Sequence, residues 1–139
     1  MSYTPEQNKA IVMRFNKECI EEGNTNSFKQ LLSENVINHA APKGSPNGPG
    51  SFYFFLNEVL AKGFPDRRIE ILAQIAEGDL VTTRKKIRAT HTGEIFSIPP
   101  SNKRVEIDII DIIRLDDGKY AEHWGLSNLS DVLKQISES

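Results

Sequence analysis

The sequence RVEIDIIDIIRLDDGKYAEHWGL, residues 104–126, decides the fold of this chain. Residues 104–115 and 120–126 have a strand-like period, and the turn signal Asp116-Asp117-Gly118 joins them, so the stretch predicts an antiparallel hairpin. Polar, titratable residues interrupt the apolar strand sequence singly. This pattern is typical of strands that line a pocket.

Asp111 lies in the middle of the first strand among isoleucines, where a carboxylate is costly unless it is paired or solvated. With a two-residue turn, Asp111 lies opposite Trp124; with a three-residue turn, it lies opposite Gly125 and diagonal to His123. The spacing leaves both registers open. It also leaves open whether Asp111 is a structural carboxylate held by His123 or Arg114, or a functional one that shares a pocket with an imidazole.

The rest of the chain predicts helices first and an antiparallel sheet afterwards. Thr4-Pro5-Glu6-Gln7 is a capping box that begins a helix over residues 5–22, and Gly23 ends it. Further helices are predicted over residues 26–33, 51–62 and 129–137, and further strands over residues 68–76 and 80–91. Residues 40–50 hold three prolines and three glycines and predict a loop at a functional rim. This order is typical of an α+β fold in which a curved sheet wraps a cavity.

Composition limits the classes of function. The 139 residues suit one domain, residues 1–139, and the net charge of −2, from 17 basic and 19 acidic residues, gives no nucleic-acid footprint. No apolar run approaches the roughly 20 residues that span a bilayer, and no targeting segment is visible, so a cytoplasmic protein is predicted. The single cysteine, Cys19, excludes an internal disulfide and a cysteine-based metal cluster, and is expected to be an inert core thiol.

The other histidines and the basic residues are weaker signals. His91 ends a strand before Thr92-Gly93, where it points towards a pocket mouth or serves as a hydrogen-bonded structural group. Asn38 and His39 precede the long loop and are expected at the rim, His39 towards solvent or substrate. No spacing typical of a metal site is present, so no metal is predicted. The one basic cluster is expected to be a solvated edge rather than an anion site; it comprises Arg84, Lys85, Lys86 and Arg88.

Several short motifs occur in an order and spacing that point to one family. They are Thr90-His91-Thr92-Gly93, Ile98-Pro99-Pro100, Asp111-Ile112-Ile113-Arg114, Asp117-Gly118-Lys119, Glu122-His123-Trp124 and Leu133-Lys134-Gln135, with Gly48-Pro49 before the third helix. In these motifs, and over essentially the whole chain, the sequence resembles the SnoaL-like polyketide cyclases of the nuclear transport factor two-like superfamily. The resemblance implies a cone-shaped α+β barrel, activity without a cofactor, and a homodimer.

Enzymes of that family, as the resemblance implies, close a ring by an intramolecular aldol reaction. A base removes an acidic proton next to one carbonyl, and a donor meets the oxyanion formed at the other. The family's carboxylate stands two residues after the histidine of the last strand and is helped by a histidine on the neighbouring strand. In this chain those two positions are Gly125 and Asp111, whereas His123 and His91 match the family.

Three hypotheses for function remain open. In the first, Asp111 is the acid/base group, with a pKa raised by its apolar neighbours, and His123 or His91 is its partner in an enzyme that acts on a small, mostly apolar carbonyl compound. In the second, the domain is a non-catalytic binder of a small hydrophobic ligand, with space gained at Gly125. In the third, the fold serves chiefly for dimerisation.

The candidate catalytic residues are therefore Asp111, His123 and His91, with His91 or Asn38 as donor to the oxyanion. The predicted substrate-binding residues are Asn38, His39, Phe15, Phe55, Leu56, Ile113, Trp124 and Asn128. The expected partners are a small-molecule substrate or ligand and a second copy of the chain, with no nucleic acid and no membrane.

Overall fold

The computed structural model describes residues 3–138, and its centre is a five-stranded curved sheet. The strands are β1 (Leu32–Asn38), β2 (Arg68–Glu77), β3 (Leu80–Thr90), β4 (Arg104–Asp116) and β5 (Lys119–Ser127), in the spatial order β1-β5-β4-β3-β2. β2 to β5 form the predicted antiparallel meander, and each matches its predicted bounds to within one residue at either end. The predicted α+β class is confirmed.

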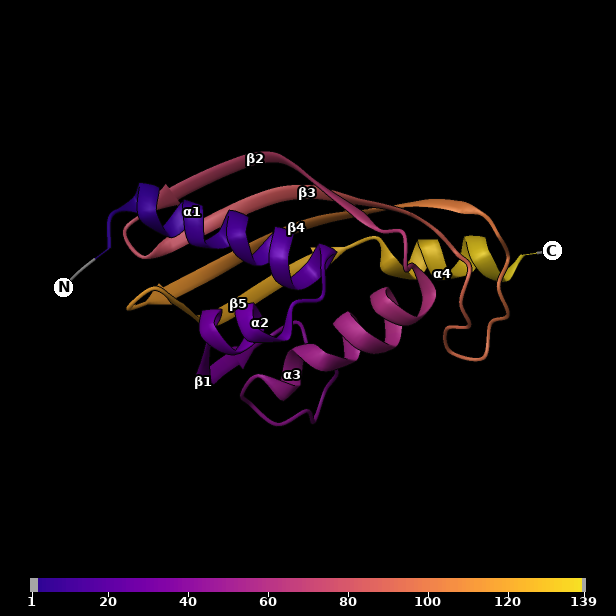
Figure 1. Cartoon of the computed structure of the whole chain (residues 1–139), viewed down its shortest axis with the longest axis horizontal. Coiled ribbons are helices and arrows are strands. Elements are labelled where there is room, and N and C mark those ends of the chain that lie inside the picture. Colours follow the sequence, from indigo (N-terminus) through magenta and orange to yellow (C-terminus); the bar gives the residue numbers. More distant parts are fainter. Residues whose placement is uncertain (1–2, 139) are drawn as a thin grey trace.

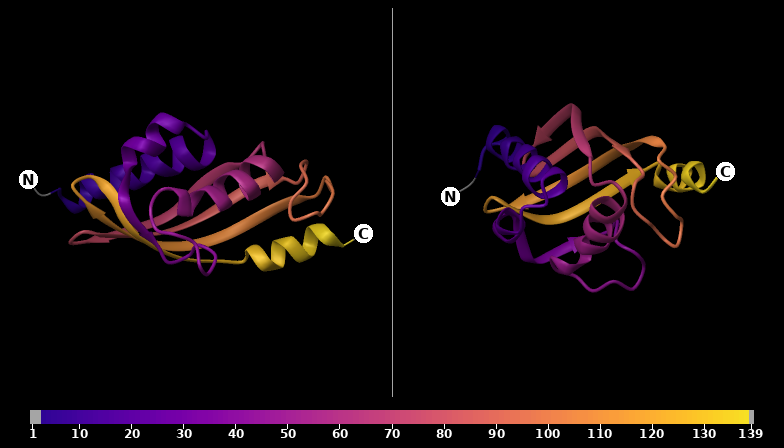
Figure 2. Two further views of the ribbon diagram at one scale, coloured as in Figure 1. Left: turned by 90° about the horizontal axis from the view of Figure 1, so that it is seen from below. Right: turned by 45° about the vertical axis from the view of Figure 1, so that its right-hand side comes forward.

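Most helices lie on one face of this sheet, as Figures 1 and 2 show. They are α1 (Pro5–Phe15), the π-helical η1 (Asn16–Glu21), α2 (Thr25–Leu31), α3 (Gly50–Tyr53) and the π-helical η2 (Phe54–Ala61). α1 begins at the predicted capping box, because the Thr4 hydroxyl accepts from the Gln7 amide at 3.1 Å and the Gln7 side chain accepts from the Thr4 amide at 2.8 Å. Gly23, with φ +69°, follows the helix as predicted.

The hydrophobic core fills the space between these helices and the inner face of the sheet. α1 and η1 contribute a buried stripe, and the inward positions of the strands face it. The fully buried large side chains include Val12, Phe15, Leu60, Phe64, Ile87, Ile107 and Ile113. Cys19 is buried in this core, and burial raises the pKa of its thiol to about 12, which keeps it protonated and unreactive.

The sequence predicts a helix to residue 33, whereas the structure has the strand β1 from Leu32. The helix ends at Leu31, and β1 pairs in parallel with β5 at the edge of the sheet. Its polar residues Ser33, Glu34 and Asn35 do not alternate with apolar ones, so the usual strand signal is missing. This strand matters for function because it places Asn38 directly beside His123.

The helix α4 (Leu129–Ser137) lies at the end of the molecule away from the start of α1 (Figure 1). Its apolar side packs through the buried Val132 and Ile136. The Lys103 ammonium donates to the carbonyls of Gln135 at 2.8 Å and Glu138 at 2.7 Å, which satisfies carbonyl groups that a helix end leaves without partners. The predicted last helix is therefore confirmed and is tied to the loop before β4.

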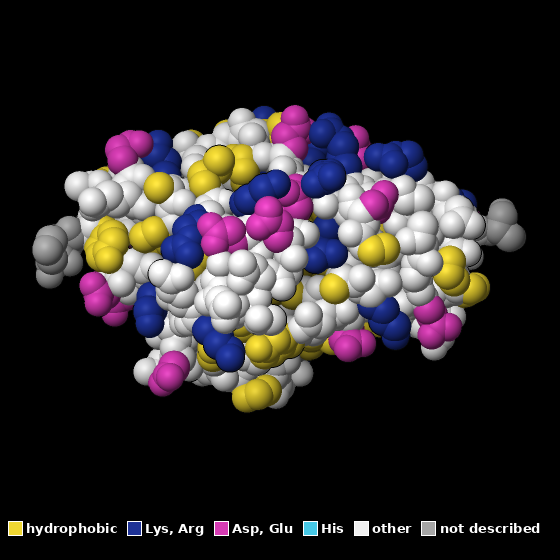
Figure 3. Space-filling view, in the orientation of Figure 1, with side chains coloured by type: hydrophobic (Ala, Val, Ile, Leu, Met, Phe, Trp, Pro, Cys, Tyr) yellow, Lys and Arg dark blue, Asp and Glu magenta, His cyan; other side chains and the backbone are white. Residues whose placement is uncertain are grey.

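The face seen in Figure 3 carries Lys and Arg interspersed with Asp and Glu, so neither sign of charge dominates it. Hydrophobic side chains are exposed near its lower edge, where α3 and η2 lie; Tyr53 and Phe54 belong to this segment. Among residues 3–138, no helix combines the length and the apolar composition that crossing a membrane would require.

Candidate active site

The register of the β4–β5 hairpin decides which side chains share the inner face. The loop has two residues, Asp117 and Gly118, both with positive φ, as a type I′ turn requires. A bulge at Ala121 then shifts the pairing by one residue, so Asp111 lies opposite Gly125 and not opposite Trp124. The shift puts Asp111 and His123 on the same, inner face of the sheet.

A continuous line of polar contacts crosses this inner face. The Lys85 ammonium, from β3, lies 3.1 Å from Oδ2 of Asp111 and donates to Oδ1 of Asn16 at 2.6 Å. Nε2 of His123 lies 3.7 Å from the same Asp111 oxygen. On its other side, Nδ1 of His123 is 2.8 Å from Oδ1 of Asn38. Lys85, Asp111 and Asn16 are all at least nine-tenths buried.

The hydrogen bonds of Asn38 fix the tautomer of His123. The Asn38 amide nitrogen donates to the carbonyl of Ser51 at 3.2 Å, and its oxygen accepts from the backbone amide of Ala40 at 3.0 Å. Backbone groups cannot exchange the roles of donor and acceptor, so the side-chain oxygen must face His123. Nδ1 of His123 therefore carries a hydrogen, and in the neutral ring Nε2, beside Asp111, has the free lone pair.

Opposing effects act on the carboxyl of Asp111. Burial is the largest influence and raises its pKa, but the charge of the Lys85 ammonium, with smaller contributions from the contact with His123, outweighs burial, and the pKa lies below the ordinary aspartate value. The raised pKa expected from the isoleucine neighbours is therefore wrong, because the Lys85 ammonium faces Asp111. Asp111 is an ionised carboxylate at neutral pH. Its buried Oδ1 has no hydrogen-bond partner among residues 3–138.

A cavity of ≈ 350 Å³ adjoins these polar groups, between the sheet and the helices. Three predicted pocket residues, Phe15, Phe55 and Leu56, line it, as do Asn38, Asp111 and His123. Phe52, Ile87, Ile109 and Tyr120 complete much of the wall. The cavity is therefore largely apolar, with its polar groups gathered on the sheet side, as is usual for small-molecule sites. Burial raises the pKa of the Tyr120 hydroxyl well above its usual value, so it stays neutral.

His91 is not among the residues that line this cavity. It is fully buried beside Phe64, and its Nδ1 accepts from the amide of Ser101 at 3.1 Å and lies 2.9 Å from the Ser101 hydroxyl. Burial lowers the pKa of His91, which favours the neutral ring. The structure thus agrees with the alternative of a hydrogen-bonded structural group, because the loop after Thr92 folds over the ring and ties it to the start of β4.

Four predicted substrate-binding residues also lie away from the cavity. His39 and Trp124 stack on each other, with ring centroids 4.9 Å apart, and His39 bonds Glu122 at 2.7 Å. Trp124 pairs with Ile112, on the face of the sheet opposite to His123. Ile113 is a core residue. Asn128 joins β5 to β4 by accepting from the Asp108 amide at 2.8 Å.

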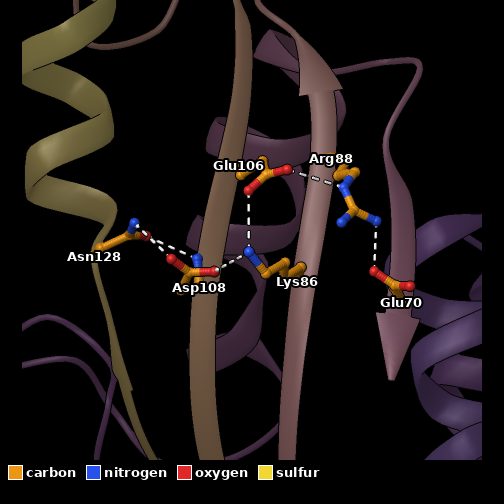
Figure 4. A network of polar contacts seen from close by, with 6 residues as sticks. All are labelled: Glu70, Lys86, Arg88, Glu106, Asp108 and Asn128. Carbon is orange, nitrogen blue, oxygen red and sulfur yellow. Dashed lines mark hydrogen bonds and ion pairs between the residues drawn. The ribbon is translucent and has the colours of Figure 1, made fainter. Parts of the chain in front are cut away.

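Lys85 is the site residue that sequence reasoning missed, because it was grouped with a solvated basic edge. Lys86 and Arg88 are solvated as expected, but on the outer face of the sheet and not at an edge, because β3 lies between β4 and β2: Figure 4 shows them in a network with Glu70, Glu106 and Asp108. Lys85 points the other way. The signal that could have found it is alternation, since Val81, Thr83, Lys85, Ile87 and Ala89 are the buried positions of β3.

Comparisons with known proteins agree with this architecture. The family model of the SnoaL-like polyketide cyclases matches residues 10–136, so the chain belongs to that family. The nogalonic acid methyl ester cyclase of Streptomyces nogalater is 22% identical over 117 residues, which cover 84% of this chain and 87% of that protein.

Two solved structures show the same fold at low sequence identity. TsrD from Streptomyces laurentii superposes with a TM-score of 0.82 at 19% identity, covering 97% of this chain and 98% of TsrD. A SnoaL-like polyketide cyclase from Agrobacterium tumefaciens gives a TM-score of 0.73 at 16% identity, covering 93% and 97% of the two chains.

Proposed function

We propose that this protein catalyses cofactor-independent proton transfer next to a carbonyl group of a small, mostly apolar substrate, in a ring closure of the aldol type. The observation that carries the proposal is the position of His123. Its tautomer is fixed by Asn38, its Nε2 lies 3.7 Å from the ionised Asp111, and the ring lines an apolar cavity. A base, a group that stabilises the protonated base, and an apolar binding space are what such a reaction needs.

Within this proposal His123, and not Asp111, is the base. The lowered pKa of Asp111 makes it a weak proton acceptor, and its Oδ2 is already occupied by the Lys85 ammonium. Imidazole is the side chain most often used to move protons near neutral pH. When His123 accepts a proton, the imidazolium gains the neighbouring carboxylate as a counter-ion. The roles are therefore exchanged relative to the first hypothesis from the sequence, in which Asp111 is the acid/base group and His123 its partner.

Gly125 supports a rearrangement of the acid/base pair rather than its loss. The resemblance to the family implies a carboxylate at position 125 and a histidine at position 111, and these two positions lie directly opposite each other. In this chain the carboxylate is Asp111, on β4, opposite Gly125 on β5. A Cβ on residue 125 would lie 3.2 Å from Cε1 and 3.3 Å from Nε2 of His123, tighter than usual contacts. Glycine therefore leaves the imidazole room beside Asp111.

Hydrogen–deuterium exchange of a model substrate tests the proposal without knowledge of the natural one. An aryl β-diketone incubated with the protein in D₂O should gain deuterium between its carbonyls faster than in buffer, as measured by NMR. The His39→Gln variant changes a histidine outside the cavity and should exchange at the wild-type rate. If the diketone binds but exchange stays at the buffer rate, the protein is a non-catalytic binder of apolar ligands instead.

We also infer that the outer face of the sheet pairs with a second copy of the chain. Ile110 and Leu126 on this face are 53% and 82% exposed, and Ile112 and Trp124 lie beside them. The helices α1, η1, α2, α3 and η2 cover the inner face instead. Exposed apolar side chains that cluster in this way mark association surfaces. Ile110→Glu should shift sedimentation velocity from dimer to monomer, whereas Met13→Glu, on the exposed side of α1, should not. A monomeric wild-type protein at micromolar concentration would contradict the inference.

A further inference from the structure

The Lys85 ammonium has more donors than the protein occupies. An ammonium carries three N–H groups. One donates to Oδ1 of Asn16 at 2.6 Å, and a second faces Oδ2 of Asp111 at 3.1 Å. No other acceptor for Lys85 occurs among residues 3–138, yet the side chain is only 4% exposed and lines the cavity. The third donor is therefore available to a group inside the cavity.

The orientation of Asn16 holds this ammonium in place. Asn16 is the first residue of η1, and its amide nitrogen donates to the carbonyl of Val12 at 2.9 Å, so its oxygen is left to face Lys85. The Lys85 side chain is thus fixed from the helix side by Asn16 and from the sheet side by Asp111. A buried ammonium held at two points cannot turn away from the cavity without losing a partner.

We propose that Lys85 receives the substrate oxygen on which negative charge develops, and that the cavity therefore selects ligands in their oxyanionic form, as enolates or phenolates. The catalytic part of this proposal rests on the function proposed above; the binding preference does not. Lys85 and His123 lie beside the same oxygen of Asp111. An acidic C–H and the oxygen of the adjacent carbonyl also lie side by side, so base and donor are suitably placed to act on one enolisable unit.

The charges balance through the reaction. The C–H bond next to the carbonyl breaks, its proton passes to Nε2 of His123, its electron pair forms the C=C bond, and the carbonyl π electrons move to oxygen. Lys85 donates to this enolate oxygen, while Asp111 faces the new imidazolium. The enolate carbon then bonds to the carbon of a second carbonyl, the first C=O reforms, and the second oxygen takes the proton from His123. The ammonium, carboxylate, imidazolium and enolate together have no net charge.

Binding of 4-nitrophenol tests the preference without any turnover, because the phenol and phenolate forms absorb at different wavelengths. In wild-type protein the bound ligand should be mostly phenolate at a pH where the free ligand is mostly phenol. Lys85→Met should weaken phenolate binding by about 10- to 100-fold, the range expected for a hydrogen bond to a charged group. Nitrobenzene, which has no hydroxyl, should bind the variant and the wild type equally well. Lys86→Met makes the same change on the outer face and should alter neither ligand's affinity.

The Asp111→Asn variant separates a direct role of Lys85 from a purely structural one. It removes the counter-ion of Lys85 but keeps the ammonium, so phenolate binding should become tighter. The double variant Lys85→Met/Asp111→Asn, which has no unpaired buried charge, should have no preference for phenolate. Lys85 is not the oxyanion donor if the double variant still prefers phenolate, or if Asp111→Asn does not bind phenolate more tightly than the wild type. Preference for phenolate without any exchange of a diketone would leave this inference standing and overturn the proposed function alone.

Discussion

Replacing His123 with glutamine should lower the rate of diketone exchange by about 10²- to 10⁴-fold, the usual contribution of a general base. Glutamine has similar length and polarity but takes up no proton near neutral pH, so the cavity keeps its shape while the proton acceptor is lost. The exchange rate, followed by NMR in D₂O, measures the effect. Circular dichroism should match the wild type, because the replacement leaves the buried apolar core unchanged.

The same assay on Asp111→Asn distinguishes His123 from the base suggested by the sequence. If His123 is the base, Asp111→Asn should reduce exchange but leave a measurable rate, since it removes only the counter-ion of the imidazolium. If Asp111 is the base, its replacement should abolish exchange and His123→Gln should retain activity. The second pattern would contradict the assignment made from the lowered pKa of Asp111 and from the Lys85 ion pair.

Local signals were sufficient to predict the larger elements. Caps, turn residues and the change from helical to strand-like periodicity act over a few neighbouring residues, so α1 with its capping box and the four antiparallel strands could be placed from sequence. β1 could not, because an edge strand with polar residues on both faces lacks alternation. Its pairing with β5 depends on where the helices α1 and α2 deliver the chain, which is a tertiary effect.

The candidate site depended on two facts: a bulge that neighbouring residues do not encode, and the inward position of Lys85, for which the local signals conflict. A two-residue turn at Asp117-Gly118 predicts the register with Asp111 opposite Trp124, and only the bulge at Ala121 reverses it. Lys85 lies in a run of basic residues, where charge suggested solvent although its strand position indicated the interior. The environment of Asp111 follows from both facts together, which is why the direction of its pKa shift was predicted wrongly.

Replacing Lys85 with methionine should lower the free energy of unfolding by about 3–5 kcal/mol at neutral pH, the range for breaking a buried ion pair on one side. Methionine fills similar space but leaves the Asp111 carboxylate, 5% exposed, without its closest cation. Urea unfolding measures the change. The matched Lys86→Met variant breaks exposed ion pairs with Glu106 and Asp108, and it should lower the free energy of unfolding by less than about 1 kcal/mol.

Two further measurements, on a double variant and on the pH dependence, test whether the unpaired charge of Asp111 causes the loss of stability in Lys85→Met. Lys85→Met/Asp111→Asn removes both charges and should be more stable than Lys85→Met alone. In the wild type the folded pKa of Asp111 is lower than the unfolded one, so its contribution to stability is complete above the unfolded pKa and is lost as the pH falls through the folded pKa. Without Lys85, burial favours the protonated carboxyl. The stability deficit of Lys85→Met should therefore shrink as the pH falls from the raised folded pKa of Asp111 in the variant towards its lowered folded pKa in the wild type, because the unfolded chains take up the Asp111 proton alike. A deficit that is constant with pH would mean that lost packing, and not the charge of Asp111, accounts for the effect.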